Sequence, residues 1–140
     1  MSPPDVIAEL RANAELYRDL LRVVEAEGQA LRREDDFNAY QFCQERKRLL
    51  PRLNQSLEKL REYRVGWQRL SAAERSAHAE IGSWLRLCQE LIMKILVLDR
   101  ENEQGLLRRG LLPAKAVPSA NRQRPHFVAD LYRRGGARQP

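Results

Sequence analysis

The chain has 140 residues, with 25 Lys and Arg against 19 Asp and Glu, a net charge of +6 and an isoelectric point near 9.8. That length accommodates one domain with a modest core. After Gly110 the sequence has six basic residues and one acid, Asp130. The body is therefore nearly neutral and the tail is basic. The overall isoelectric point therefore does not by itself indicate a nucleic-acid or membrane binder.

A first helix is predicted over residues 5–33. Apolar or small residues recur there in alternating steps of three and four, at Ile7, Leu10, Ala14, Tyr17, Leu21, Val24, Gly28 and Leu31. A heptad seam held over more than three repeats indicates a long amphipathic helix, because a strand alternates with a period of two.

A second helix is predicted over residues 36–69, with Asp35 and Asp36 supplying the turn and the N-cap. Its seam comprises Ala39, Cys43, Arg46, Leu50, Leu53, Leu57, Leu60 and Trp67, and Arg64 stands where an apolar residue is due. Pro51 interrupts the backbone hydrogen bonds of a helix. Because the heptad phase continues through it, we expect a kink rather than a break.

A third helix is predicted over residues 72–108, opened by a capping box from Ser71 to Glu74. Its seam comprises Ala77, Ile81, Trp84, Cys88, Leu91, Ile95, Leu98, Asn102 and Leu106. Flanking Leu85, Ile92 and Leu96 widen the apolar face, which predicts contacts from two sides. Gly105 and Gly110 are alternative helix ends. The short turns predict an all-α fold, an elongated, coiled-coil-like, up-down-up antiparallel bundle of three helices over residues 1–110.

Residues 111–140 are interpreted as a flexible basic tail, because Pro113, Pro118 and Pro125 with scattered small residues replace the heptads. A short amphipathic island at 126–134 carries Phe127, Leu131 and Tyr132, which would share one face of a helix. The island either docks on the bundle or folds on a partner.

The sequence favours a non-enzymatic protein, because no catalytic, metal-binding or cofactor-binding pattern is found in it. His78 and His126 lack a carboxylate or thiol at a useful spacing, and Cys43 and Cys88 are interpreted as small core residues. The most apolar window, residues 91–98, is too short to cross a bilayer, and no signal peptide is recognised. We therefore expect a cytoplasmic protein without membrane insertion. Five net charges and no recognition-helix pattern argue against direct nucleic-acid binding.

Two features indicate partner binding instead. Asn102 lies on the apolar seam, where it fixes register, fringes the core or borders a groove. Leu106 and Leu107 lie beyond the stretch that the other two helices are expected to cover. With Phe127, Leu131 and Tyr132 of the tail, these residues form the predicted partner-binding set.

The order of these elements resembles the FlgN-like flagellar export chaperones. Residues 16–21 (LYRDLL), 25–31 (EAEGQAL), the acidic turn 35–37 (DDF) and 45–50 (ERKRLL) are similar to the opening of that family. Lys47, Leu49 and Leu50 keep the character of its "K-x-x-L-L" element. Residues 98–107 (LDRENEQGLL) resemble its "N-x-x-N-x-x-L-L" end, with Asn102 at the second asparagine and Asp99 in place of the first.

The resemblance covers roughly residues 10–110 and implies a cytoplasmic chaperone. Such a protein binds flagellar hook-associated proteins, covers their polymerisation-prone terminal helices and delivers them to the type III export apparatus. The basic balance departs from the acidic character common among secretion chaperones. A coiled-coil adaptor that self-associates as a homo-oligomer, and a basic-tailed nucleic-acid-associated factor, remain the alternative interpretations.

Overall fold

A computed structural model describes residues 2–33 and 37–110, and all regular structure in those ranges is helical. Three long helices and one short helix follow one another along the chain: α1 (Pro3–Arg32), α2 (Ala39–Gln68), α3 (Ala72–Ala77) and α4 (Ala79–Arg108). At 1.5 Å per residue, each of the three 30-residue helices is about 45 Å long. The predicted tail and its island lie outside the described residues.

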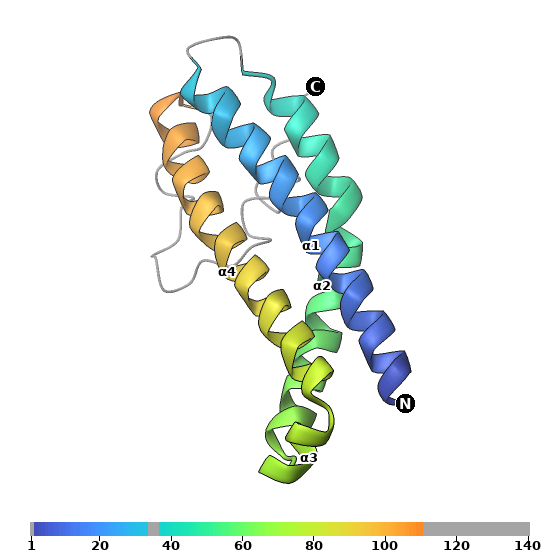
Figure 1. Ribbon diagram of the computed structural model, residues 1–140. Coiled ribbons are helices and arrows are strands. Elements are labelled where there is room, and N and C mark those ends of the chain that lie inside the picture. The colour runs from blue at the N-terminus through green and yellow to red at the C-terminus, as the bar shows by residue number, and fades with distance from the viewer. Residues whose placement is uncertain (1, 34–36, 111–140) are drawn as a thin grey trace.

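The long helices lie side by side, and α1 contacts both of the others (Figure 1). Side-chain contacts give their directions. The Cys88 thiol of α4 meets the Leu10 carbonyl, and Asn102 further along α4 meets Val24 further along α1, so these two helices run the same way. Helix α2 descends between them in the chain, and Figure 1 shows α3 at the opposite end of the molecule from the α1–α2 connection.

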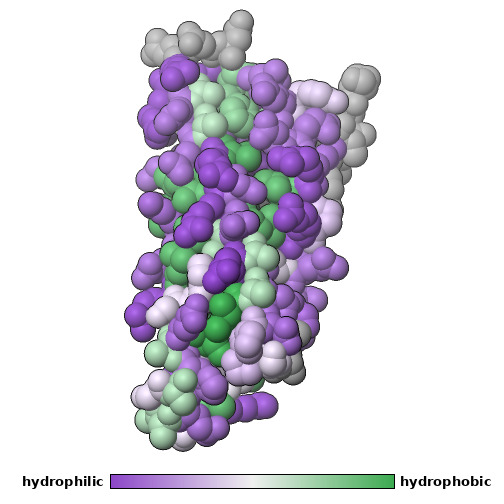
Figure 2. Space-filling view, turned by 45° about the vertical axis from the view of Figure 1, so that its right-hand side comes forward, coloured by the Kyte–Doolittle hydropathy of each residue, from purple (hydrophilic) through white to green (hydrophobic). Residues whose placement is uncertain are grey.

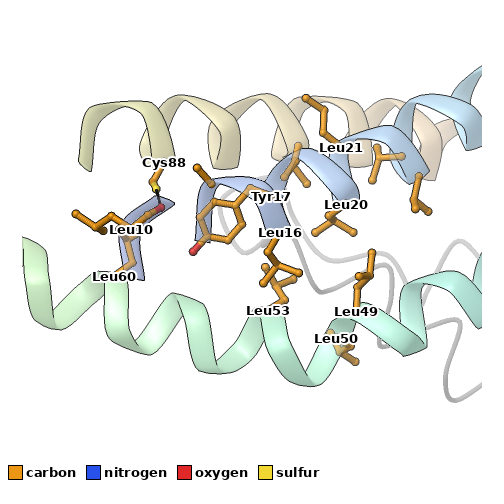
Figure 3. Packing of buried hydrophobic residues seen from close by; sticks show 14 of the residues in the cluster. Leu10, Leu16, Tyr17, Leu20, Leu21, Leu49, Leu50, Leu53, Leu60 and Cys88 are labelled. Atoms are coloured by element: carbon orange, nitrogen blue, oxygen red, sulfur yellow. Dashed lines mark hydrogen bonds between the residues drawn. The ribbon is translucent and has the colours of Figure 1, made fainter. Parts of the chain in front are cut away.

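The core follows the predicted seams. Figure 3 shows Leu16 and Leu20 of α1 directed at Leu53 and Leu49 of α2, whereas Leu21 points toward α4. The apolar residues of α1 and α4 that are fully buried are Leu10, Ala14, Tyr17, Val24, Cys88, Ile95 and Leu106. Both cysteines are buried thiols, as the sequence predicts. Burial raises the pKa of Cys88 to about 11, so this thiol is protonated and unreactive at neutral pH.

The helix boundaries differ from the prediction in two places. Helix α2 begins at Ala39, not at residue 36, because the Asn38 side chain caps it by accepting from the Gln41 amide at 3.0 Å. The predicted third helix is divided at His78, whose φ of −125° and ψ of 47° are not helical. All residues of α3 are exposed, and Arg75 ties this helix to the end of α2 by donating to the carbonyls of Trp67 and Gln68 at 3.2 and 3.0 Å. The Ser71–Glu74 capping box is present as predicted.

The structure resolves two points that the sequence left open, the effect of Pro51 on α2 and the choice of glycine that ends α4. Helix α2 continues through Pro51 as one helix. Gly110 follows the end of α4 with a φ of +71°, a conformation in which a side chain would be strained. Gly105 instead lies inside α4, where an added Cβ would come 3.3 Å from Leu31. Its small size lets α4 approach α1 closely.

Candidate partner-binding surface

The predicted site residue Asn102 lies inside the molecule. Its side-chain nitrogen donates to the Val24 carbonyl of α1 at 2.8 Å and to Glu27 Oε1 at 2.9 Å. Its oxygen lies so close to Gly28 that a Cβ there would be 2.7 Å away. The contacts give Asn102 the register-fixing role, because only one axial position of α4 satisfies them together.

Asn102 belongs to a buried polar group, here called the Arg46 cluster, in which α1, α2 and α4 meet. Arg46 of α2 donates through Nη2 to Glu27 Oε1 at 2.7 Å and to Asp99 Oδ1 at 2.6 Å, and through Nε to Glu27 Oε2 at 3.2 Å. All members are at least 96% buried: Glu27, Arg46, Asp99, Asn102 and Glu103. The cluster ties α2 to both neighbours at one level of the molecule.

Burial and charge oppose one another in this cluster. Burial raises the pKa of Asp99 to about 6, although Arg46 acts in the other direction. Burial alone would lower the pKa of Arg46, but Asp99 and Glu27 outweigh it and raise that pKa, so the guanidinium stays charged. Ion pairs of this kind are costly to desolvate and disruptive to break, so the cluster specifies helix register more than it adds stability.

Leu106 is also buried, in a satellite cluster with Cys43, Leu31, Phe37 and Leu107. The sequence argument assumed that Leu106 lies beyond the reach of the other helices, and that premise does not hold. Leu107 is partly buried. The tail residues Phe127, Leu131 and Tyr132 lie outside the described part of the chain, so their part in the predicted set stays a prediction.

Sequence reasoning missed a different surface, on the side where α2 faces α4. These two helices touch at few points, while α1 packs closely on α4. One contact is the Arg46–Asp99 pair. Another is Arg64 of α2 with Gln89 of α4: with the amide oxygen turned toward Arg64, Nε donates to it at 2.9 Å. The surface of α2 and α4 between these two contacts is here called the α2–α4 groove, and a hollow lies at its Arg64 end.

Helical periodicity identifies the residues that line this groove. Gln89 and Asp99 both reach α2, and the steps 89, 92, 96, 99 place Ile92 and Leu96 on the same face of α4. Both are only partly buried, as is Leu57 on α2. The floor of the groove is therefore apolar and incompletely covered.

Helices α2 and α4 also carry exposed apolar side chains. Met93 and Val97 of α4 are 59% and 55% exposed, and Tyr40 and Val65 of α2 are 67% and 42% exposed. By helical spacing, Val65 follows Leu57 by eight residues and Met93 adjoins Ile92. Figure 2 shows that one face of the molecule carries hydrophobic surface in a broken band between hydrophilic side chains. The four large exposed apolar residues of the described chain thus lie on α2 and α4, and Val97 is one residue, or about 100°, around α4 from Leu96.

Helix α2 borders two hollows, and one of them is shared with α4. One of about 460 Å³ lies on α2 and is lined by Lys47, Leu50, Pro51 and Asn54. The other, of about 220 Å³, lies between the lower parts of α2 and α4 and is lined by Arg64, Trp67, Gln68, Gly82, Leu85, Arg86 and Gln89. Both combine apolar walls with basic side chains.

A larger hollow of about 790 Å³ lies between the last turns of α1 and α4. Its arginines have a structural use: Arg109 donates to the Leu31 carbonyl at 3.1 Å and lies over the Phe37 ring at 5.9 Å. It closes the end of α1, where unsatisfied carbonyls favour a cation. Within residues 2–33 and 37–110, no group of three His, Cys, Asp or Glu side chains is arranged to hold a metal.

Comparisons with known proteins return no match: no family model, no curated protein and no solved structure is significantly similar to this chain. In the part of the chain that the structure describes, no helix is apolar enough over a sufficient length to cross a membrane. The α2–α4 groove is therefore the feature from which we infer a function.

Proposed function

We propose that this protein is a helix-binding export chaperone of the FlgN-like kind, which holds the terminal helix of a hook-associated subunit in the α2–α4 groove. The observation that carries the proposal is the incomplete burial of Leu57, Ile92 and Leu96, together with the exposure of Met93 and Val97 on α4. A free amphipathic helix aggregates unless its apolar face is covered, and a groove between two helices is a common binding place for one.

The proposal takes α1, α2 and α4 as an up-down-up bundle that lacks a fourth member. A bound helix would supply that member by packing on Leu57 and Leu96. The Arg46 cluster would hold α2 and α4 at a fixed separation, so that the groove exists before the client arrives. Prior organisation lowers the entropic cost of binding.

The sequence assigned the client surface to Asn102, Leu106, Leu107 and the tail. Since Asn102 and Leu106 are buried, we place the client surface on the groove and keep the tail as a segment that closes over it. Cytoplasmic location and delivery to the type III export apparatus belong to the same proposal. They rest on the sequence resemblance.

Calorimetric titration of the full chain with the terminal segment of a hook-associated protein tests the proposal. The double variant Met93→Asp/Val97→Asp should lose most of its affinity while its circular dichroism stays helical. The matched control is Ala8→Asp, on an exposed position of α1, and it should bind normally. Unchanged binding by the double variant rules out the groove, and no binding by the parent chain rules out this client class.

Truncation after Gly110 tests the tail separately. Weaker binding by the truncated chain, with α1, α2 and α4 intact by circular dichroism, supports a closing role for the tail. Equal affinity shows that the groove alone holds the client.

A further inference from the structure

The Arg46 cluster encloses more acid than base. Its buried members comprise one cation, Arg46, and three carboxyl groups, those of Glu27, Asp99 and Glu103. Glu27 comes from α1, Arg46 from α2 and the other two from α4, so each long helix supplies a charged group. A buried carboxylate without a cation of its own is costly, and a proton removes that cost. The composition of the cluster therefore favours proton binding.

The hydrogen bonds identify Asp99 as the place of the proton. Both oxygens of Glu27 accept from Arg46, and Asn102 also donates to this carboxylate. Asp99 accepts from Arg46 through Oδ1, and within the described chain its buried Oδ2 has no hydrogen-bond partner. A proton on Oδ2 removes the charge that this oxygen would otherwise carry out of reach of water. The direction of the pKa agrees, since burial raises the pKa of Asp99 to about 6 while Arg46 acts in the other direction.

The part of α2 that carries Arg46 has few attachments to α4. The two helices touch at few points, and the Arg46–Asp99 pair is one of them. Pro51 lies inside α2, five residues after Arg46. Because proline has no amide hydrogen, the Lys47 carbonyl lacks its usual backbone donor, and helices bend most readily at such a place. Residues 39–50 are therefore joined to the rest of α2 through a turn that lacks one hydrogen bond.

We propose that residues 39–50 form an arm that opens about Pro51, and that a proton on Asp99 Oδ2 holds this arm closed. In the closed arm α2 keeps water from Asp99, so the carboxylate is disfavoured there. When the arm opens, water reaches the carboxylate and the residue ionises with an ordinary pKa. The closed arm therefore binds the proton more tightly than the open arm. Closure is most favoured below about pH 4 and weakens as the pH rises through 6.

This arm requires no client and goes beyond the proposed function. Imidazoles are the side chains that ordinarily titrate between pH 5 and 7.5, and the chain has two of them. His78 precedes α4, about 30 Å along the helix from Asp99 at 1.5 Å per residue. His126 lies outside the described residues. The variant His78→Gln/His126→Gln therefore serves as a control that should keep the pH response of the parent.

The two buried thiols report opening of the arm in a single experiment. Cys43 lies on the arm and packs on Leu106 of α4, whereas Cys88 lies in the α1–α4 seam. The full chain is treated with dithiodipyridine at pH 5 and pH 7.5, and the modification of each cysteine is followed by mass spectrometry. Each rate is divided by the rate for the urea-unfolded chain at the same pH, which removes the effect of thiol ionisation.

We expect Cys43 to react at least about tenfold faster than Cys88, because local opening is more frequent than complete unfolding. The normalised rate at Cys43 should rise about tenfold between pH 5 and pH 7.5, the change that follows from the two pKa values of Asp99. Equal rates at the two thiols would mean that only complete unfolding exposes Cys43, which overturns the arm. A rate at Cys43 that does not change with pH overturns control by a proton.

Substitutions test the place of the proton and the place of the bend. Asp99→Asn cannot ionise, so its Cys43 rate should change less than about twofold across the same pH range. A pH response that survives Asp99→Asn, or that is lost in Glu103→Gln instead, overturns the assignment to Asp99. Pro51→Ala restores the missing amide and should slow the reaction of Cys43 several-fold at both pH values. An unchanged rate in that variant overturns the bend at Pro51.

Discussion

Helix α4 contacts its two long neighbours in different ways. Against α1 it buries close-packed apolar side chains, with Cys88 and Ile95 fully covered and Gly105 permitting close approach. Against α2 it makes few contacts, namely the polar pairs Arg46 with Asp99 and Arg64 with Gln89 and the close approach of the Trp67 ring to Gly82. The side of α4 that faces α1 is thus a closely packed core. The side that faces α2 makes fewer contacts and has partly buried apolar residues.

The difference between these two interfaces of α4 indicates which interactions determine the stability of the fold and which determine the position of α2. Dry apolar packing contributes most of the folding free energy, whereas a buried ion pair roughly balances its own desolvation. The α1–α4 seam should therefore determine how stable the fold is. The Arg46 cluster should determine where α2 lies and, through it, the width of the α2–α4 groove.

The largest effect is expected from removing Arg46, because its loss leaves Glu27 and Asp99 buried without their cation. Arg46→Ala should lower the free energy of unfolding by about 3–5 kcal/mol in urea denaturation. In a Glu27→Gln/Asp99→Asn background the same substitution should cost much less, since no charge is then stranded. Arg48→Ala, on an exposed position of the same helix, serves as the control and should stay within about 0.5 kcal/mol.

Truncation of apolar residues on the two flanks of α4 sharpens the comparison. Ile95→Ala, in the fully buried seam, should cost about 2–5 kcal/mol. Met93→Ala, on the groove flank, should change stability by less than about 0.5 kcal/mol and instead weaken helix-peptide binding. Similar losses of stability for the two variants would mean that Met93 is covered in the folded chain.

The dependence of stability on pH tests the balance within the Arg46 cluster. The pKa of Asp99 is about 6 when folded and 3.8 in the unfolded reference, so the native state binds the extra proton between these values. Its contribution to stability is then greatest below about pH 4 and is lost as pH rises through 6. Relative to Asp99→Asn, the parent should gain roughly 1–3 kcal/mol between pH 7 and pH 4. A constant difference across that range would show an ordinary pKa for Asp99.

The smallest effects are expected from two glycine-to-alanine substitutions, which add the same methyl group at a crowded and at an open position. An added Cβ at Gly28 would meet the Asn102 oxygen at 2.7 Å, so Gly28→Ala should cost about 1–3 kcal/mol. At Gly66 in α2 an added Cβ meets nothing within 4 Å, so Gly66→Ala should stabilise the protein by about 0.5–1 kcal/mol. Thermal unfolding of both variants measures the difference, and equal shifts would mean that α4 moves freely against α1 at Gly28.

The helices and much of the core could be predicted from sequence, because heptads report which face of each helix is buried. The Ser71 cap could also be predicted, because a capping box depends only on residues three apart in the sequence. The Arg46 cluster was not predicted, although Arg46 and Asn102 stand on apolar seams. Its partners Glu27 and Asp99 lie beside the seams, and their pairing depends on the axial register between helices, which periodicity does not report. The α2–α4 groove was missed because a widened apolar face on α4 predicts contact on two sides but not how tight each contact is.

The parallel direction of α1 and α4 also has a consequence for how the chain folds. The paired residues Leu10 and Cys88, like Val24 and Asn102, are 78 positions apart, so the main seam cannot form by local pairing. At 5–20 residues per second on the ribosome, α1 would wait roughly 4–16 s for α4. During that interval Leu16 and Leu20 can be buried only in the α1–α2 hairpin, which forms from contacts closer in sequence. Because long-range contacts slow folding, closure of the α1–α4 seam should be the rate-limiting step of refolding.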